Sequence, residues 1–443
     1  MFPINRVTIL FLLFVGGLQE LARAEVKVSQ TRLLSEYGAS GVTDYGSSNK
    51  IVTLGGKTHV AWLDSVSETM VASFDHATGS WTEPVKVGTG IDNHGIPALT
   101  CDSSGYLHII YGPHGRQPFQ HSRSAQPNNA EKWVHLNDFG ENPTYPSLVC
   151  DDEDTLHITY RGGDSPFKLV YQRRPKGGDW SEPLFLAKTP GKNYSRYNHN
   201  LAIAGNGTLH LTYILYYPED GKKYFRWGGH LMSLDRGMSW TLADGTPVKL
   251  PIESSSDAIV WKLKEGEAVL IDGLACSTDG RPWIMVSTLE AGAKGEWAQT
   301  LTHHDGKRWH HIKPSFLIPP ELQGESVHRF GMMTIDTKDS IYLMTLIGGQ
   351  ITVRGSHVAV AYSDDKGKTF QVVQVFPPAA DKSHIHGWLN IERSTGNHSV
   401  ETPWLLFYTG MWGSTDNIDK GIFNKVRALQ LSISDCRLAI GDW

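Results

Sequence analysis

Two histidines frame the stretch of sequence with the clearest chemical potential. The segment DNHGIPALTCDSSGYLHIIYGPH runs from Asp92 to His114, with His94 near its start and His114 at its end. Between the histidines, two β-prone runs flank an Asp-Ser-Ser-Gly turn, a pattern that favours a hairpin. The start of a hairpin's first strand and the end of its second lie side by side. The sequence therefore predicts that His94 and His114 meet at one end of a sheet.

A tyrosine and an arginine are expected near the same end. Tyr160 ends a strand in the unit that follows the histidine hairpin, and Arg173 and Arg174 lie on the next strand. Side chains alternate along a strand, so Tyr171 and Arg173 share one face and Arg174 takes the other. The pattern leaves open which arginine points inward, and Arg173 is the favoured candidate.

These residue types suit the removal of a proton next to a sugar carboxylate. Histidine or tyrosinate can act as the base near neutral pH, a cation can neutralise the carboxylate, and tyrosine can protonate the departing glycosidic oxygen. Either His94 or Tyr160 could be the base in this scheme. Glycoside hydrolysis usually needs two carboxylates about 5–10 Å apart. The sequence offers no clear pair of that kind beside the histidines, and no cluster of three arginines of the sialidase type.

The elements that would position these residues form an internal repeat. A strand pattern of the form x-L-H-I-x-Y recurs about every fifty to seventy residues, the length of a four-stranded propeller blade. Its seven copies are KTHVAW (57–62), YLHIIY (106–111), TLHITY (155–160), TLHLTY (208–213), RPWIMV (281–286), SIYLMT (340–345) and TPWLLF (402–407). The last unit lacks a clear fourth strand, which Val26–Leu34 could supply. We predict an all-β fold, a single seven-bladed β-propeller of four-stranded antiparallel blades over residues 25–443.

The repeat separates structural histidines from chemical ones. One repeat position holds His59, His108, His157 and His210, and in other units Trp283, Tyr342 and Trp404. A position that accepts tryptophan equally well is a packing position. Turns of the Asp-box type, clearest at 233–240 and 363–370, are also expected to be structural. In such turns Asp and Gly form the bend, and the aromatic residue covers the edge of the blade.

The position of His94 precedes the innermost strand of its unit, and in a propeller this places it at the mouth of the central channel. The equivalent positions in other units are Tyr45, Pro143, Arg196, His328 and His384. A ring of histidine, arginine and tyrosine suits an anionic, hydroxyl-rich ligand.

Composition and targeting narrow the class of protein. The 443-residue chain has a formal net charge of -5, which argues against an electrostatically driven nucleic-acid binder. Residues 1–24 indicate an export signal, with a basic start at Arg6, an apolar run too short to span a membrane, and an Ala-Arg-Ala cleavage site. No later segment is apolar enough to cross a membrane. We expect a secreted or periplasmic monomer that starts near Glu25.

The cysteines and the remaining histidines give no strong metal motif. Cys101, Cys150, Cys276 and Cys436 are interpreted as buried small hydrophobes, with a disulfide between neighbouring units or a thiolate metal ligand as alternatives. A structural metal ion stays open in the fifth unit, which offers Cys276, His303, His304, His310 and His311. The elimination chemistry described above needs no cofactor.

A family resemblance appears at these residues. At Asp92-Asn-His-Gly95, at Gly112-Pro-His-Gly115 and around Tyr160 and Arg173, the chain resembles the BNR-repeat propeller polysaccharide lyases, the ulvan lyase families. The resemblance spans essentially the whole mature chain. It implies that His94, His114, Tyr160 and Arg173 form an eliminating site on ulvan, a sulfated polymer of rhamnose and uronic acid. It also implies substrate-binding candidates at Arg196 and in the segment 213–217, where Tyr216 or Tyr217 is the favoured contact. His328 is a further substrate-binding candidate because of its expected place at the channel mouth.

Three functions are therefore considered. The first is an exported lyase that cleaves an ulvan-like polysaccharide by β-elimination. The second is a propeller glycoside hydrolase similar to the α-L-rhamnosidases, which use a histidine of the first blade; here the first unit offers only Tyr45 and His59. The third is a non-catalytic carbohydrate-binding propeller. Of these, only a lyase creates a conjugated double bond in its product.

Overall fold

The computed structural model describes residues 25–39, 41–43, 46–189, 196–219, 222–253, 258–264, 266–291, 297–325, 331–348, 355–381, 383–411 and 423–434. The predicted export signal at residues 1–24 lies outside the described residues, as does Cys436. The described chain is almost entirely strands and turns, with two short 3-10 turns, η1 (Ser65–Ser67) and η2 (Pro320–Leu322). No helix in this part of the chain has the length and apolar character needed to cross a membrane.

Five sheets follow one another along the middle of the chain, each built mainly from consecutive antiparallel strands. Four of them have four strands in sequence order, and the fifth gains an extra parallel strand, β23, beside β27. The first two sheets hold β7 (Ala98–Cys101), β8 (Leu107–Tyr111), β9 (Phe119–Gln126) and β10 (Asn129–Phe139), then β11 (Thr144–Cys150), β12 (Leu156–Gly162), β13 (Lys168–Arg174) and β14 (Leu184–Lys188). The third and fourth hold β15 (Arg196–Ile203), β16 (Leu209–Glu219), β17 (Lys222–Ser233) and β18 (Ile259–Lys262), then β19 (Ala268–Cys276), β20 (Pro282–Leu289), β21 (Trp297–His304) and β22 (Trp309–Ile312). The fifth holds β23 (Ser315–Leu317), β24 (Met332–Ile335), β25 (Ile341–Ile347), β26 (His357–Ser363) and β27 (Thr369–Phe376).

A sixth, nine-stranded sheet joins the two ends of the described chain. Its strands are β1 (Glu25–Gly38), β2 (Ile51–Leu54), β3 (Lys57–Asp64), β4 (Glu68–Asp75), β5 (Ser80–Trp81), β6 (Val85–Thr89), β28 (Ile385–Ile391), β29 (Trp404–Gly410) and β30 (Asn424–Ser434). The group β28-β29-β30-β1 and the group around β3 and β4 are linked by a single residue pair, Gly38 with Asp64. This sheet therefore consists of two antiparallel groups whose strands pair with each other at one position.

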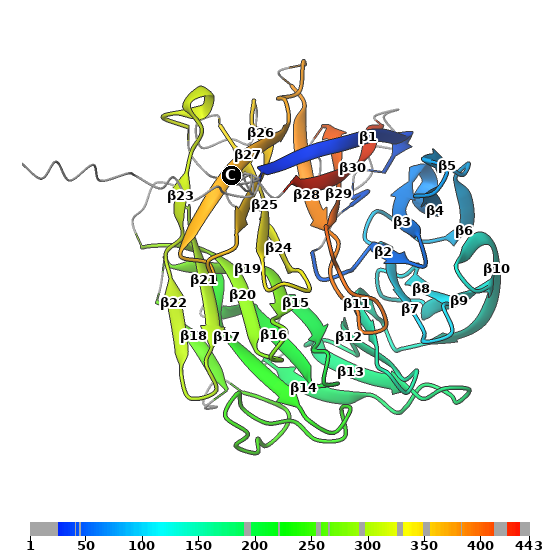
Figure 1. Cartoon of the computed structure of the whole chain (residues 1–443). Helices are drawn as coiled ribbons and strands as arrows, with labels where there is room; N and C mark the ends of the chain where they lie inside the picture. The colour runs from blue at the N-terminus through cyan, green and yellow to red at the C-terminus, as the bar shows by residue number, and fades with distance from the viewer. Residues whose placement is uncertain are drawn as a thin grey trace, which may run out of the picture.

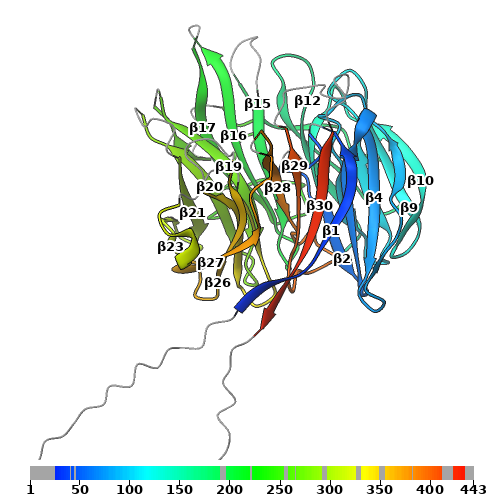
Figure 2. The same ribbon diagram turned by 90° about the horizontal axis from the view of Figure 1, so that it is seen from above.

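The terminal strands close the structure as the sequence predicted. β1 pairs with β30 from Glu25 opposite Ser434 to Gly38 opposite Asn424, and Figure 2 shows the two strands side by side. The prediction that Val26–Leu34 completes the last unit is confirmed.

The sheets are arranged around a common centre in a propeller-like manner (Figure 1). The first strands of successive sheets contact one another in the order β2, β7, β11, β15, β19, β24 and β28. Because neighbouring sheets cover both faces of a blade, strands such as β8 and β25 are buried along their whole length. The all-β prediction and the antiparallel four-stranded sheets are confirmed.

The repeated histidines are packing residues. His157 is fully buried, and its two ring nitrogens lie 3.1 Å from a carboxylate oxygen of Asp151 and 2.7 Å from the hydroxyl of Tyr171. His59, His108 and His210 are buried in the same way. Buried polar groups are usually hydrogen-bonded, and these rings follow that rule inside the sheets.

The Asp-box turn after β17 is also structural. Ser233 donates to Asp235 at 2.9 Å, and the backbone N–H of Gly237 donates to the Ser233 hydroxyl at 2.8 Å. Gly237 has φ +80°, and a Cβ there would meet the hydroxyl of Tyr171 in the preceding sheet. The guanidinium of Arg236 lies 3.0 Å from a carboxylate oxygen of Asp151. The turn thus ties two sheets together.

The connection between β28 and β29 reaches across the centre of the molecule. Arg393 donates to Asn200 in β15 at 2.6 Å and to the carbonyl of Ser47 at 3.1 Å, and the carbonyl of Thr395 accepts from the backbone N–H of Cys150 at 2.8 Å. Beside Arg393, burial raises the pKa of Glu392 to about 7. This connection, residues 392–403, joins the last unit to three others.

The cysteines in the described residues are free thiols. Cys101 and Cys150 are buried and Cys276 is partly buried. Burial raises the pKa of the Cys101 thiol to about 12 and that of Cys150 further. These side chains are therefore protonated, and they behave as the small hydrophobes that the sequence predicted.

Candidate active site

The hairpin brings the two histidines together as predicted. His94 lies just before β7 and His114 just after β8, and their rings stack with centroids 3.8 Å apart and planes 14° from parallel. The His94 side chain is 15% exposed and the His114 side chain 31%. Both imidazoles are therefore fixed by neighbours and still accessible from outside.

One carboxylate holds both rings. Asp92 places one oxygen 3.0 Å from Nδ1 of His94 and the other 2.8 Å from Nδ1 of His114, and it also accepts the backbone N–H of His94 at 2.8 Å. Burial opposes ionisation of Asp92, but the hydrogen bonds from His114 and His94 outweigh it and hold the pKa of this carboxyl well below its usual range. A carboxylate can only accept, so we assign the proton on each ring to Nδ1. With Nδ1 protonated, Nε2 is the ring atom of each histidine that can accept a proton.

A strained tyrosine stands beside this pair. The ring centroid of Tyr145 lies 6.2 Å from that of His94, and Tyr145 has φ +62°, a left-handed backbone that an aromatic residue rarely adopts. The pairing of β11 with β12 is irregular here, because Thr144 pairs with Arg161 and the next pair is Ser147 with Thr159. Such strain costs roughly 1–3 kcal/mol and clusters at functional sites.

A buried arginine completes the group. The guanidinium carbon of Arg161 lies 4.8 Å from the ring centroid of Tyr145 and 4.5 Å from that of Phe167. Arg161 is only 3% exposed, and one of its terminal nitrogens is 3.4 Å from the Thr144 hydroxyl. The aromatic faces hold the planar cation in place. A fixed positive charge therefore adjoins the tyrosine.

Tyr160 lies elsewhere. It is 1% exposed, its ring packs edge-on against Phe119 with centroids 5.3 Å apart, and its hydroxyl donates to the side-chain oxygen of Gln172. Burial also raises the pKa of Tyr160. Because side chains alternate along β12, Tyr160 and Arg161 point to opposite faces. The structure therefore places Tyr160 in the interior between two sheets, on the opposite face of β12 from Arg161.

Arg173 lies toward the other end of its sheet. β13 runs away from the histidine end, with Lys168 opposite Gly162 and Arg173 opposite His157. Five residues of strand separate these pairs, a distance of about 17 Å. Arg174 is one residue further along. The direction of this strand places Arg173 toward the end of the sheet opposite Gly162, and its catalytic role stays a sequence prediction.

Comparison with known proteins gives the family. A family model for BNR repeat-containing family members matches residues 57–317. The chain belongs to this family. This match and the relatives described next confirm the resemblance to BNR-repeat polysaccharide lyases that was found in the sequence.

Curated relatives of this BNR repeat protein are named as ulvan lyases. An ulvan lyase of Pseudoalteromonas sp. (strain PLSV) is 25% identical over 333 residues, which cover 66% of this chain and 67% of the relative. An ulvan lyase of Alteromonas sp. (strain LOR) is 25% identical over 57% of this chain and 61% of the relative. A third, from Nonlabens ulvanivorans, is 30% identical over 30% of this chain and 34% of the relative.

Solved structures share the fold. An ulvan lyase structure of the PL25 family superposes with a TM-score of 0.70 at 17% identity, covering 90% of this chain and 95% of the other. A structure of a PL25 ulvan lyase bound to -[GlcA(1-4)Rha3S]- superposes with a TM-score of 0.70 at 16% identity, covering 90% of this chain and 95% of the other. These similarities establish a common architecture.

The expected substrate-binding residues of the BNR repeat protein are only partly described. Arg196 and Tyr216 are paired at the start of β15 and the end of β16, and the hydroxyl of Tyr197 donates to the Phe167 carbonyl at 2.7 Å. This end of the third sheet therefore adjoins Phe167 and the Arg161 guanidinium. The side chains of Arg196 and Tyr217 lie outside the described part of the chain, as does His328.

Asp92, His94 and His114 also offer three potential metal-ligand atoms within 4.8 Å of one another. His303, His304, His310 and His311 form no comparable group among the described residues. The expectation of a structural metal in the fifth unit therefore stays a prediction.

Two residues of the site escaped the sequence reasoning. Tyr145-Pro146 matches Ile96-Pro97 in the preceding unit. The tyrosine that replaces an isoleucine at the start of an inner strand was the feature of the sequence that could have indicated Tyr145. Arg161 follows Tyr160 directly, and the alternation of side chains along a strand predicts that the two point to opposite faces of the sheet. The decisive features, the left-handed backbone and the stacking of Arg161, appear only in three dimensions.

Proposed function

We propose that the chain is an exported polysaccharide lyase that cleaves a uronate-containing, sulfated, ulvan-like polysaccharide by β-elimination. The proposal rests on one arrangement: two histidines bridged by Asp92, next to Tyr145 and the guanidinium of Arg161. The ulvan lyases among its relatives support the reaction and the substrate class. Elimination requires a base, an acid and a cation, and this group supplies all three.

The geometry supports the following chemical roles. Arg161 neutralises the uronate carboxylate and so stabilises the negative charge that develops when C5 loses its proton. His94 is the base, since Asp92 keeps its proton on Nδ1 and Nε2 is the ring atom that can accept the C5 hydrogen. The C5–H electrons form the C4–C5 double bond as the C4–O4 bond breaks. Tyr145 donates its proton to O4, and His114 adds a second donor or acceptor at the mouth.

In this proposal Tyr145 and Arg161 take the roles that the sequence assigned to Tyr160 and Arg173. Tyr160 and Arg173 stay sequence predictions, and they serve as matched controls below. Arg196, Tyr216, Tyr217 and His328 are proposed to bind neighbouring sugar units. The chemistry uses side chains alone, without a cofactor.

We also infer the finer architecture and the location. The two groups of the nine-stranded sheet count as separate blades, since one residue pair links them, and this gives a seven-bladed propeller over residues 25–443. The predicted signal at residues 1–24 supports a secreted or periplasmic protein, which we infer to act as a monomer.

The test is a continuous ultraviolet assay with ulvan, because only elimination creates an absorbing unsaturated uronate. His94→Ala and Tyr145→Phe should each lower kcat by about 10²–10⁴-fold, the usual contribution of an acid or base. Arg161→Lys should lower it by about 10²-fold or more. Tyr160→Phe and Arg173→Lys should stay within threefold of the wild type.

The outcomes separate the alternatives. New reducing ends without absorbance would establish a hydrolase, and binding of ulvan without turnover would establish a carbohydrate-binding propeller. A silent Tyr145→Phe together with an inactive Tyr160→Phe would refute the assignment of the acid. Thermal melting of each variant distinguishes lost chemistry from lost folding.

A further inference from the structure

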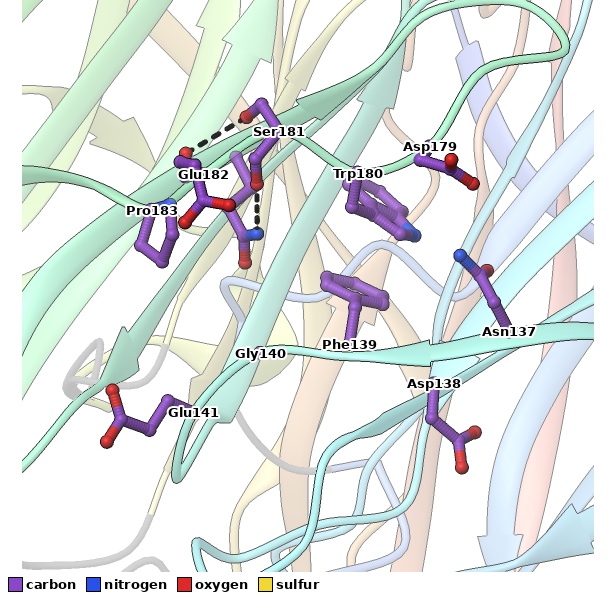
Figure 3. A pocket seen from close by; sticks show the side chains of 11 residues that line it. Asn137, Asp138, Phe139, Gly140, Glu141, Asp179, Trp180, Ser181, Glu182 and Pro183 are labelled. Atoms are coloured by element: carbon purple, nitrogen blue, oxygen red, sulfur yellow. Dashed lines mark hydrogen bonds between the residues drawn. The ribbon is translucent and has the colours of Figure 1, made fainter.

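A second pocket opens between two neighbouring sheets, away from the histidine pair. It has a volume of about 390 Å³ and is lined by the end of β10, by Gln172 of β13 and by residues 179–183 ahead of β14 (Figure 3). None of Asp92, His94, His114, Tyr145 or Arg161 lines it. It is therefore distinct from the candidate active site.

Two aromatic rings form a rigid part of its lining. Phe139 and Trp180 stack with ring centroids 4.0 Å apart and planes 15° from parallel, as Figure 3 shows. Beside them Gln172 is 5% exposed and is fixed at both ends, since it accepts from the Tyr160 hydroxyl and donates to the Ser181 carbonyl. The surface is thus preformed and offers apolar ring area to a ligand.

Two hydrogen-bond donors lie next to the rings. The indole N–H of Trp180 is buried and has no hydrogen-bond partner among the described residues. The side-chain oxygen of Asn137 is 3.2 Å from a ring nitrogen of His121, and Figure 3 shows its amide nitrogen pointing toward Trp180 and Asp179. A buried donor without an acceptor is costly, and a ligand oxygen would satisfy it.

The rim supplies acceptors and negative charge. The exposed carboxylates of Asp138, Glu141, Asp179 and Glu182 surround the rings, and the described lining includes no lysine or arginine. Sulfate and uronate groups would be repelled here. A simple cation would satisfy the carboxylates but would leave the two N–H donors without an acceptor. A ligand with hydroxyl groups meets both requirements, because a hydroxyl donates and accepts.

We propose that this pocket is a binding site for a neutral saccharide. One sugar ring lies against the Phe139–Trp180 pair, its hydroxyl oxygens accept from the N–H groups of Trp180 and Asn137, and its hydroxyl hydrogens go to the rim carboxylates. In this role the site holds the protein on uncharged glycan. This inference does not depend on the proposed lyase activity.

The experiment measures binding directly. Saturation-transfer NMR and titration calorimetry would be run on the mature chain with methyl glycosides of rhamnose, xylose, glucose and galactose and with xylotetraose and cellotetraose. Glucuronate and spermidine are the anionic and cationic comparisons. We expect millimolar binding of at least one neutral ligand. Trp180→Ala should weaken it at least tenfold, and Trp133→Phe, on the outer strand of the same sheet, should leave it unchanged.

Asn137→Asp distinguishes the ligand classes. This substitution keeps the acceptor for His121 but removes a donor and adds a charge, so it should weaken neutral saccharides about 3–10-fold, the value of one hydrogen bond. Stronger binding of spermidine than of every neutral sugar, increased further by Asn137→Asp, would show a cation site and overturn the proposal. Failure of the whole neutral panel to bind, or binding insensitive to both variants, would overturn it as well. Thermal melting of Trp180→Ala, compared with that of the wild type, tells a local change from a folding defect.

Discussion

Replacing Asp92 by asparagine tests the idea that one carboxylate sets the chemistry of both histidines. Asparagine keeps the size of the side chain but has one acceptor oxygen instead of two. The oxygen facing His94 accepts two hydrogen bonds, from Nδ1 at 3.0 Å and from the backbone N–H at 2.8 Å, whereas the other accepts one, from His114 at 2.8 Å. The amide oxygen should therefore face His94 and the amide nitrogen His114. His114 must then move its proton to Nε2.

The magnitude follows from the hydrogen bonds lost. A bond to a charged group contributes about 1.5–3 kcal/mol and a neutral one about 0.5–1.5 kcal/mol. Replacing the charged acceptor by a neutral one therefore weakens the hydrogen bond to each ring by roughly 1–1.5 kcal/mol, about 2–3 kcal/mol for the two rings together. If this energy orients the rings in the transition state, kcat falls about 30–150-fold.

Two measurements check this reasoning. Steady-state kinetics by ultraviolet absorbance should show a lower kcat with KM within threefold, because the carboxylate does not touch the substrate. Nitrogen-15 NMR of labelled histidine should show that His114 changes tautomer in Asp92→Asn while His94 does not. A variant that keeps more than a third of the wild-type kcat would refute the role of Asp92. A change confined to KM would assign Asp92 to substrate binding instead.

Three further predictions concern stability. Gly237 has φ +80°, and the Cβ of Gly237→Ala would meet the Tyr171 hydroxyl, so this substitution should lower the free energy of unfolding by at least about 3 kcal/mol. Gly245 has a similar φ of +88°, but a Cβ there meets nothing within 4 Å, so Gly245→Ala should lower it by only about 1 kcal/mol. Glu392 has a pKa of about 7 in the folded state and 4.5 in the unfolded state, so the folded state binds more protons between pH 4.5 and 7. The stability of the wild type should therefore fall by up to about 3 kcal/mol as the pH rises through this window. Glu392→Gln should flatten this pH dependence. Arg236→Ala should cost about 1 kcal/mol, less at high salt, because its side chain is 31% exposed.

Urea denaturation followed by tryptophan fluorescence measures all three. Equal losses for Gly237→Ala and Gly245→Ala would show that the contact with Tyr171 is not tight. A wild-type curve that is flat between pH 5 and 8, or one that Glu392→Gln leaves unchanged, would rule out a buried proton on this residue. An effect of Arg236→Ala that is independent of salt would mean that packing and not charge joins the two sheets.

The sequence predicted the architecture well because the repeated strand pattern marks the units of the fold. The recurring strand and the turn before it are local patterns, so β8, β12 and β16 could be located directly. The pairing of β1 with β30 followed from counting strands in the last unit. The contrast of His157 with Trp283 and Tyr342 at one repeat position predicted that the repeated histidines are packing residues, and the structure agrees.

The candidate site was only half predictable. His94 and His114 come together through a hairpin, which is a local event. Tyr145 depends on an irregular pairing and a left-handed backbone, and neither has a reliable signature in one sequence. The position of Arg173 along its sheet depends on the direction of β13, which places it opposite His157, and its role stays a prediction. Tyr160 and Arg161 differ by one position, and a shift of one residue exchanges the two faces of a strand.

The pairing of β1 with β30 has a consequence for how the chain can be rearranged. Glu25 and Ser434 are partners on adjacent strands, so a short linker could join them without disturbing the ring. New ends could then be opened at an exposed turn such as the one at Gly177, where a Cβ would meet nothing within 4 Å. Circular permutants are tolerated where termini lie close together and new ends fall in exposed turns. The same closure makes folding depend on contacts between the most distant parts of the described chain, which favours slow, cooperative assembly.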